Sequence, residues 1–458
     1  SAKLGVNFLS SVDAGSENAS YGNFQITPAQ KPWTKSQQWS NALLAKIIEL
    51  SESLSIEAVK SVVQELQSRH PALRLKFKTS TTNDISEKKQ WSQMVEAESE
   101  PYESVKVLSL TATTGSEREL RALSEQIAAE VSITNGINGI VGLISISKYP
   151  ASQALVIAMH PCVVDQDSMN ILAEDTLALL RGSKLGPLAP ASFKQWAERL
   201  NVRAEGLTWT KDWDSVVGVP PREELEKSAV FAERTSVLAH SVVSTHASLH
   251  ELPLGNLGED PLDVLLAAVT ATIQDDALSS SFSPTSRRVV WIRERVNEAS
   301  GLSTEDVSRL VGPLAIEYPV SCENTAFASQ SEAETEGQID AVQRAKDARR
   351  RSRAAAINFA ALASSVEQEL TEQAAQRIVL VFDGDCHTNA LVGLGDTCAI
   401  IIQLQTGGGT SGLMCWHRHG STSANSGQIS ALVNQIGLTM EEMSLACSTL
   451  PKQVLTAS

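Results

Sequence analysis

Short apolar segments that favour β-strands alternate along this chain with longer segments whose apolar residues recur at helical spacing. The first strand is expected at 43–50, and Ile56, Val59 and Val63 place the next segment on a helix. Further strands are expected at 73–77, 140–146, 154–159, 289–292, 378–382 and 399–404. Further helices are expected at 120–131, 168–180, 193–200, 261–273, 336–353 and 429–438. This alternation predicts a layered α/β fold.

The chain has 458 residues, which is long for one domain. The segment 182–190 contains two glycines and two prolines and lies between two helical patterns. Glycine and proline in such a position favour a connection rather than a continued helix. We therefore expect a hinge there, with an N-terminal lobe at 1–182 and a C-terminal lobe at 190–458.

The charge balance limits the classes of partner. The chain has 53 Asp and Glu against 38 Lys and Arg, for a formal net charge of −15. Binding to nucleic acid needs clustered basic residues, so this class is not expected. No apolar run approaches the length that spans a membrane, and the first residues do not resemble a secretory signal. The six cysteines contain no CxxC pair, which favours free thiols and a cytoplasmic location.

One segment has the organisation of a catalytic motif. Residues 159–175 read MHPCVVDQDSMNILAED, where a strand ends and a helix follows at once. This segment resembles the HHxxxDG motif of the condensation and epimerization domains of nonribosomal peptide synthetases. His160 takes the position of the first His and Pro161 that of the second. Asp165 takes the position of the Asp and Gln166 that of the Gly.

Other segments resemble motifs of the same superfamily, in the same order. Residues 26–30 are similar to a TPxQ motif, 69–74 to RHxxLR, and 192–197 to SFxxWA. Residues 306–312, together with 318–320, are similar to DLSRTVGWFTxxYPV, which is typical of epimerization domains. The resemblance covers nearly the whole chain. Neither end resembles a natural terminus, so we also expect this chain to be part of a longer synthetase.

The resemblance implies a fold and a substrate class. It implies two chloramphenicol-acetyltransferase-like lobes that form a V-shaped pseudo-dimer with a tunnel between them. The tunnel would receive a substrate tethered to the phosphopantetheine of a peptidyl carrier protein, without a bound cofactor. In epimerization domains a His and a Glu face each other across the tunnel and move a proton at the substrate α-carbon. Such chemistry needs a base within hydrogen-bond reach of the C–H group.

The chain departs from the family pattern where this chemistry resides. The base of the family is the second His, and Pro161 has no proton to exchange and no backbone N–H. The Glu of the family lies in an EGHGRE segment, whose counterpart at 291–298 has lost the glycines and the His. A loose alignment places Glu294 at the acid, whereas counting back from Glu298 places Arg293 there.

Two further segments differ from the active-site motifs of the family. Residues 356–360 resemble GIGYG with Phe359 in place of Tyr, and residues 382–384 resemble FNYLG without its Asn. The framework motifs stay readable while four active-site segments differ. We therefore expect that the fold persists and that the original chemistry is lost or replaced.

Several residues have both a structural and a chemical interpretation. His160 and Glu294 are the candidate acid/base residues, although the first His of the family motif is usually structural. Asp165 resembles a family Asp that pairs with a buried Arg, and Arg74 is the expected partner. A buried charge without a partner would be costly, so the structural role is favoured. Cys162 is expected to be a small buried side chain rather than a nucleophile.

The basic residues of the helix at 336–353 have two open interpretations. Arg349, Arg350 and Arg353 contact either the phosphopantetheine phosphate or an acidic carrier, or they form a solvated helix face. No metal site is expected. The groups at 385–387 and at 417–419 contain His but lie on separate segments, and the second suits an edge strand.

Three functions follow from the resemblance. The first is a domain of secondary metabolism that engages a carrier-tethered aminoacyl or peptidyl thioester without standard epimerase activity. Its role would be structural, or it would recruit other synthetase domains or tailoring enzymes. The second is an enzyme with altered chemistry on the tethered intermediate, such as release, cyclisation or isomerisation, with His160 or Glu294 as acid/base. The third, ordinary epimerization or condensation, is disfavoured because Pro161 replaces a His.

Overall fold

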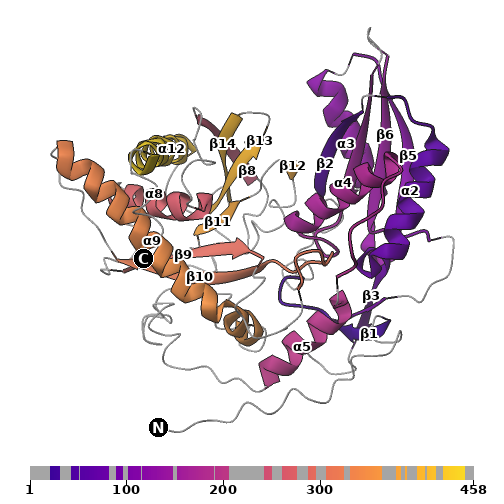
Figure 1. The fold of residues 1–458 in the computed structure, drawn as a ribbon, viewed down its shortest axis with the longest axis horizontal. Coiled ribbons are helices and arrows are strands. Elements are labelled where there is room, and N and C mark those ends of the chain that lie inside the picture. The colour runs from indigo at the N-terminus through magenta and orange to yellow at the C-terminus, as the bar shows by residue number, and fades with distance from the viewer. Residues whose placement is uncertain are drawn as a thin grey trace.

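The structure is a computed structural model in which two sheets with their helices lie beside one another (Figure 1). It describes residues 21–30, 43–50, 52–81, 89–95, 102–114, 116–147, 152–189, 191–205, 242–249, 260–275, 287–295, 306–323, 331–363, 378–382, 387–388, 400–407, 410–418 and 426–448. We call the described residues up to 205 the N-terminal half and those from 242 onward the C-terminal half.

The sheet of the N-terminal half is covered on both faces. Its strand order is β12-β2-β7-β6-β5. The strands are β2 (Leu44–Leu50), β5 (Val105–Ala112), β6 (Gly139–Ile146), β7 (Ser152–Met159) and β12 (His387–Thr388). Helices α2 (Ile56–Arg69) and α4 (Gln166–Leu180) cover one face and α3 (Glu117–Glu130) covers the other. Because both faces are buried, Val141 and Ile140 enter different apolar clusters, which explains the continuous apolar run of β6.

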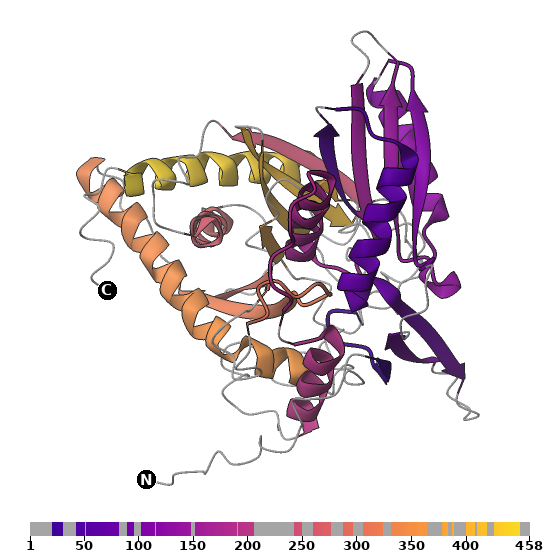
Figure 2. The same ribbon diagram turned by 45° about the vertical axis from the view of Figure 1, so that its right-hand side comes forward.

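The sheet of the C-terminal half has six strands in the order β10-β9-β11-β13-β14-β8. The strands are β8 (Val242–Leu249), β9 (Arg287–Glu294), β10 (Ile316–Glu323), β11 (Ile378–Phe382), β13 (Ile400–Gly407) and β14 (Thr410–Arg418). Helices α8 (Pro261–Asp275), α9 (Ser331–Ala363) and α12 (Ser426–Ser448) pack against it. Figure 2 shows α8 end-on between α9 and α12. A helix enclosed in this way is apolar on all sides, as its buried run Val264–Val269 shows.

Smaller elements connect the halves. A three-stranded sheet has the order β1-β4-β3, from β1 (Gly22–Gln25), β4 (Lys89–Val95) and β3 (Leu75–Thr81). Helix α5 (Phe193–Glu205) packs against both β1 and α9. Strand β12, although late in the sequence, pairs with β2 of the first sheet. The lobe limits of 1–182 and 190–458 stay a prediction. Within the described ranges, no helix combines the length and apolar character that crossing a membrane requires.

The expected α/β alternation is confirmed, and its local differences include the following three. The strand expected at 73–77 begins only at Leu75, because Pro71 opens a short 3-10 turn, η3 (Pro71–Arg74). The helix expected from Ser168 begins at Gln166, because the carboxylate of Asp165 caps it by accepting the Ser168 N–H. Strand β14 is not an edge strand, since β8 pairs along its other side. Of the other His-containing segment, 385–387, only His387 is among the described residues. Pro190 of the expected hinge lies outside them.

Candidate functional site

The loop after β7, which holds the HHxxxDG-like motif, is buried and tightly hydrogen-bonded. The side chain of His160 is 1% exposed, and its Nδ1 accepts the backbone N–H of Cys162 at 3.0 Å. The backbone oxygen of His160 accepts the N–H of Val163 at 2.9 Å. Gln30, of the TPxQ-like segment, donates its Nε2 to the carbonyl of Cys162 at 2.8 Å. The ring of His160 therefore has a structural contact within its own loop.

Pro161 and Cys162 are both buried in this loop. Burial raises the pKa of the Cys162 thiol well above its ordinary value. A thiol that is hard to ionise is a poor nucleophile. The burial and the direction of this pKa shift favour the interpretation of Cys162 as a small buried side chain.

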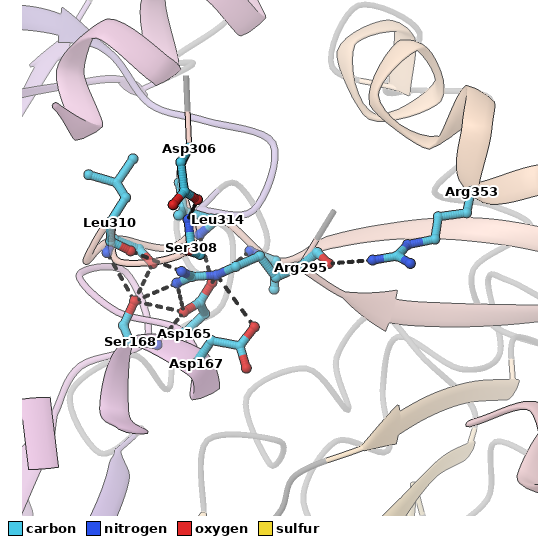
Figure 3. Close-up of polar contacts among 11 residues, drawn as sticks. Asp165, Asp167, Ser168, Arg295, Asp306, Ser308, Leu310, Leu314 and Arg353 are labelled. Carbon is cyan, nitrogen blue, oxygen red and sulfur yellow. Dashed lines mark hydrogen bonds and ion pairs between the residues drawn. The ribbon is translucent and has the colours of Figure 1, made fainter. Parts of the chain in front are cut away.

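Asp165 joins the two halves of the molecule. Its Oδ1 accepts a hydrogen bond from Nη2 of Arg295 at 2.5 Å, and its Oδ2 accepts one from Nε of Arg295 at 3.2 Å. Oδ2 also accepts the backbone N–H groups of Leu314 and Ala315, at 3.1 and 3.0 Å. Figure 3 shows these contacts converging on the first turn of α4. We call Asp165, Ser168 and Arg295, with the backbone at 310–315, the Asp165 cluster.

The expected pairing of Asp165 with Arg74 is wrong. Asp165 pairs with Arg295, which follows β9 of the C-terminal half, at a sequence separation of 130 residues. Arg74 lies in η3, where its guanidinium carbon is 5.4 Å from the ring centre of Tyr21 and 4.9 Å from that of Tyr102. Its Nη1 donates to the Tyr102 hydroxyl at 3.4 Å. Aromatic faces, rather than a carboxylate, surround the charge of Arg74.

Ser168 extends the Asp165 cluster into the other framework motifs. Its Oγ accepts the backbone N–H of Gly312 at 3.0 Å and Nη2 of Arg295 at 2.8 Å. A Cβ at Gly312 would lie 2.6 Å from the ring of Phe193, so this close approach requires glycine. Phe193 belongs to the SFxxWA-like segment and Gly312 to the DLSRTVG-like segment. Three motifs that are far apart in sequence therefore meet at this point.

A second group of ion pairs joins the halves along α4. Asp175 accepts a hydrogen bond from Nε2 of His70 at 3.0 Å, its Oδ2 lies 3.2 Å from Nε of Arg69, and it also pairs with Arg309. Burial lowers the pKa of His70, although Asp175 opposes this shift. Burial acts to raise the pKa of Asp175, but the hydrogen bond and charge of His70 and the two arginines outweigh it and lower this pKa.

Glu294 is held by side chains of its own half. Its Oε2 accepts Nη1 of Arg349 at 2.9 Å, and its Oε1 accepts the hydroxyl of Tyr318. Nε of Arg353 lies 3.4 Å from Oε1. Burial, followed by the charge of Glu294, raises the pKa of Tyr318, so the phenol keeps its proton. We call Glu294, Tyr318, Arg349 and Arg353, with Asp260 and Asp263, the Glu294 cluster.

The three arginines expected at a carrier contact have different environments. Arg349 is buried, with Nε 2.7 Å from Asp263 and Nη2 2.5 Å from Asp260. Burial acts to lower its pKa, but these carboxylates and Glu294 outweigh it and raise the pKa. Arg350 is exposed and lies 3.3 Å from Asp347. Arg353 is 39% exposed and donates to the backbone oxygen of Arg295 at 3.4 Å, as Figure 3 shows.

Asp167 is the accessible carboxylate beside the Asp165 cluster. Its side chain is 53% exposed, and its Oδ2 lies 3.5 Å from Nε of Arg295. Burial, followed by the negative charge of Asp165, raises the pKa of Asp167, and the charge of Arg295 opposes this. Figure 3 places its carboxyl group next to the Asp165–Arg295 pair. No group of three metal-binding side chains occurs among the residues that the structure describes.

Sequence reasoning missed Arg295, Tyr318, Asp175, Arg309 and Asp167 as parts of this region. Arg295 lies in the segment that was interpreted only as a drifted EGHGRE motif, and Tyr318 lies in the YPV segment. Charged residues inside the motifs are a weak signal of ion pairing, because the sequence does not show which acidic residue pairs with which basic residue. Their partners became evident only from the three-dimensional arrangement.

Comparisons with known proteins assign this chain to a family. The model of the family described as Condensation domain matches residues 23–274, more than half of the chain. The chain is 25% identical over 310 residues to the nonribosomal peptide synthetase ungA' of Aspergillus campestris, which covers 65% of this chain and 3% of that protein. It is 26% identical over 224 residues to surfactin synthase subunit 1 of Bacillus subtilis, covering 46% of this chain and 6% of that protein. The chain thus spans a small part of these relatives.

Solved structures agree in fold. The epimerization domain from the third module of tyrocidine synthetase B superposes with a TM-score of 0.68 at 16% identity, covering 95% of this chain and 100% of that one. The X-domain in a complex with OxyB from teicoplanin biosynthesis has a TM-score of 0.57 at 14% identity, covering 92% and 93%. The expected superfamily and fold are confirmed. The chain belongs to the condensation-domain family, and its fold is that of the epimerization domain and the X-domain named above.

Proposed function

We propose that this domain engages a carrier-tethered aminoacyl or peptidyl thioester without epimerizing it, and that its role is structural or recruiting. The observation that carries the proposal is the engagement of both candidate acid/base residues in structural contacts. Nδ1 of His160 accepts the Cys162 N–H, and both oxygens of Glu294 accept donors from Tyr318 and Arg349.

Epimerization requires two placed groups, one that removes the α-proton and one that returns it to the opposite face. Each such group typically contributes about 10²–10⁴-fold in rate. Pro161 stands where the family has its base and has no exchangeable proton. Both oxygens of Glu294 already accept hydrogen bonds, from Arg349 and from Tyr318, so these donors compete with a substrate proton for the carboxylate. The expected rate is therefore close to that of the uncatalysed exchange.

The same geometry limits which of the three arginines could contact a carrier protein. Arg349 belongs to the Glu294 cluster, where its guanidinium forms ion pairs with Asp260, Asp263 and Glu294. The side chains of Arg350 and Arg353 on α9 are 74% and 39% exposed. We propose that these two contact the phosphopantetheine phosphate or an acidic surface of a peptidyl carrier protein, through charge complementarity. No bound cofactor is needed, because the carrier would supply the phosphopantetheine.

The recruiting role has a precedent in the fold. The structure of the teicoplanin X-domain is of a complex with OxyB, and that X-domain has the same fold as this chain. We propose that this domain likewise offers a surface to another synthetase domain or a tailoring enzyme.

One observation favours a second function, altered chemistry on the tethered intermediate. Asp167 is 53% exposed, its Oδ2 lies 3.5 Å from Nε of Arg295 and its pKa is raised, so it is an accessible acidic group beside the Asp165 cluster. Release, cyclisation or isomerisation of a tethered molecule would need such a group. Incubation with a loaded carrier, followed by mass spectrometry of the carrier, tests this function. New products that disappear with Asp167→Asn would support it over the non-catalytic role.

A binding and exchange experiment tests the first function. The domain is titrated with an upstream carrier protein loaded with an aminoacyl group, and α-carbon exchange is then followed in D₂O. We expect measurable binding, weakened by Arg353→Gln, with exchange at the level of a no-domain control. Exchange well above that control and lost with His160→Ala or Glu294→Gln would identify an active epimerase. An absence of binding would contradict carrier engagement.

A further inference from the structure

Helix α12 presents apolar residues on its outer face as well as on its inner one. Elements α8, α9, β8 and β14 pack against the helix. Its inner face is made of buried residues, among them Leu432, Val433, Ile436, Met440 and Met443. On the outer face, Leu438 is 53% exposed and Leu445 is 65% exposed. A helix at a protein surface normally has polar residues on the side away from the core, so the two leucines depart from the usual pattern.

The two leucines differ from the other exposed apolar residues in their spacing. Three other exposed large apolar residues occur among the described residues, each on a different segment: Ile47, Leu188 and Val202. Single residues of this kind are normal on a protein surface. Leu438 and Leu445 are seven residues apart on one helix, and Ala431, seven residues before Leu438, is exposed as well. A spacing of seven keeps residues on one side of a helix, as in the seam between two packed helices.

The position of α12 leaves this seam open to a partner. Figures 1 and 2 show the helix at the margin of the C-terminal half, with α8 on its inner side. We call Ala431, Leu438 and Leu445, with the polar residues beside them, the outer face of α12. A partner could reach this face without entering between the halves.

The sizes of the three apolar residues fit a second copy of the same helix. In an antiparallel pair with its two-fold axis at Leu438, this leucine meets its own counterpart. Ala431 of one copy then lies level with Leu445 of the other, because both are seven residues from the axis. A small side chain thus meets a large one at each end of the seam.

The flanking polar residues fit the same orientation. Asn434 and Gln435 precede Leu438, and Glu441 and Glu442 follow it. The antiparallel pair brings the two carboxamides of one copy level with the two carboxylates of the other, and an amide N–H donates to a carboxylate. A parallel pair would instead bring the glutamates of both copies together, and like charges repel. The outer face is therefore complementary to itself in one orientation only.

We propose that the outer face of α12 is a self-association surface, on which a second copy of this chain packs antiparallel about Leu438. The inference does not rest on the proposed carrier engagement. A seam of one helix buries less than the roughly 1,600 Å² of a standard interface, so the dimer is weak and forms on the order of tens of micromolar. Each chain has a formal net charge of −15, so salt should strengthen the association by screening this repulsion.

Sedimentation equilibrium of the 458-residue chain tests the association. We expect a monomer–dimer equilibrium for the wild type between about 1 µM and 1 mM. Leu438→Glu should raise the dissociation constant at least about tenfold, because it removes the central apolar contact and places two carboxylates at the axis. Val202→Glu is the matched control, since Val202 is 66% exposed on α5 and should dimerise as the wild type does. A wild type that stays monomeric, or equal effects of the two variants, would overturn the proposal.

A charge variant tests the orientation. Gln435→Lys places an ammonium group level with Glu442 of the second copy and should lower the dissociation constant about threefold, as for exposed ion pairs formed twice by symmetry. Gln435→Glu should raise it by a similar factor. If both variants change the association equally, the carboxylates do not face this position and the antiparallel arrangement is wrong.

Disulfide cross-linking locates the axis. In the proposed pair only residue 438 meets its own counterpart, so Leu438→Cys should form a covalent dimer on oxidation. Leu445→Cys should not, because the two copies of that residue lie about 21 Å apart along the helices and a disulfide needs Cα atoms within about 7 Å. The wild type, whose Cys415 and Cys447 are buried, gives the background. Cross-linking of Leu445→Cys but not of Leu438→Cys would contradict the register, and no cross-linking of Leu438→Cys would overturn the proposal.

Discussion

Arg295 and Arg74 are both buried, yet different interactions hold them in place. Arg295 is 6% exposed and donates to Asp165, to Ser168 and to the carbonyl of Leu310, the last at 2.9 Å. Arg74 is 2% exposed, but it lies against two tyrosine rings. Its Nε and Nη2 have no hydrogen-bond partner in the part of the chain that the structure describes.

Arg295 therefore connects the two halves, whereas Arg74 contributes to packing within one half. The contacts of Arg295 join α4 to the C-terminal half, so the ionic pair sets how the halves meet. The contacts of Arg74 stay within the N-terminal half, near Tyr21 and Tyr102. A buried cation can thus be compensated by a carboxylate or by aromatic faces, and removal of the cation strands a buried charge only in the first case.

The largest effect is expected at Asp165. Asp165→Ala leaves the buried Arg295 without its carboxylate and removes the cap of α4, so it should cost about 3–5 kcal/mol of unfolding free energy. Chemical denaturation measures this loss. The double variant Asp165→Ala with Arg295→Met should recover part of it, because no charge is then stranded. An unchanged stability for Asp165→Ala would show that the Asp165 cluster is not formed.

A smaller effect is expected at Arg74. Arg74→Met loses two cation–π contacts, each worth about 0.5–2 kcal/mol, but it strands no carboxylate and removes unsatisfied polar atoms. The net cost should therefore be roughly 1–2 kcal/mol, below that of Asp165→Ala, in the same denaturation series. If Arg74→Met costs as much as Asp165→Ala, the two arginines do not differ as proposed.

Acid should weaken the second connection between the halves. The folded-state pKa of His70 lies below its ordinary value of 6.5, so protonation favours the unfolded chain and stability falls as the pH drops below 6.5. The folded-state pKa of Asp175 lies below 3.8, so its stabilising contribution is lost as the pH falls below that value. Melting temperatures across this range should show both declines. His70→Gln should remove the upper one, and a pH-independent wild type would contradict the ion-pair group at Asp175.

The smallest effect is expected at Asp167. Its folded-state pKa is raised above 3.8, so stability is lost as the pH rises from 3.8 through the folded pKa. Asp167→Asn should therefore be slightly stabilising at neutral pH and without effect in strong acid. The side chain is 53% exposed, so solvent screening keeps the gain small. A destabilised Asp167→Asn at neutral pH would mean that its pairing with Arg295 outweighs burial and the repulsion by Asp165.

The framework of the fold could be predicted from the sequence, because local patterns determine strands, helices and the ordered motifs. Strand β6 was expected from its apolar residues, and helix α4 was expected from a capping residue at Ser168. The partner of Asp165 could not be predicted in the same way, because pairing over 130 residues depends on where β9 ends in space. Glu294 was identified as a candidate acid, but its contacts with Tyr318 and Arg349 depend on the packing of β10 and α9.

The central claim is that loss of the family's second His is only part of the change, because the candidate acid is also engaged in structural contacts. Pro161→His tests this claim most directly, since it restores the missing side chain in the HHxxxDG-like motif. The measurement is α-deuterium exchange of an aminoacyl-loaded carrier in D₂O, with folding of the variant checked by circular dichroism. Exchange should stay at the level of the no-domain control, because Glu294 remains bound to Tyr318 and Arg349. Exchange well above that control would show that the site is still arranged for epimerization and would contradict the account.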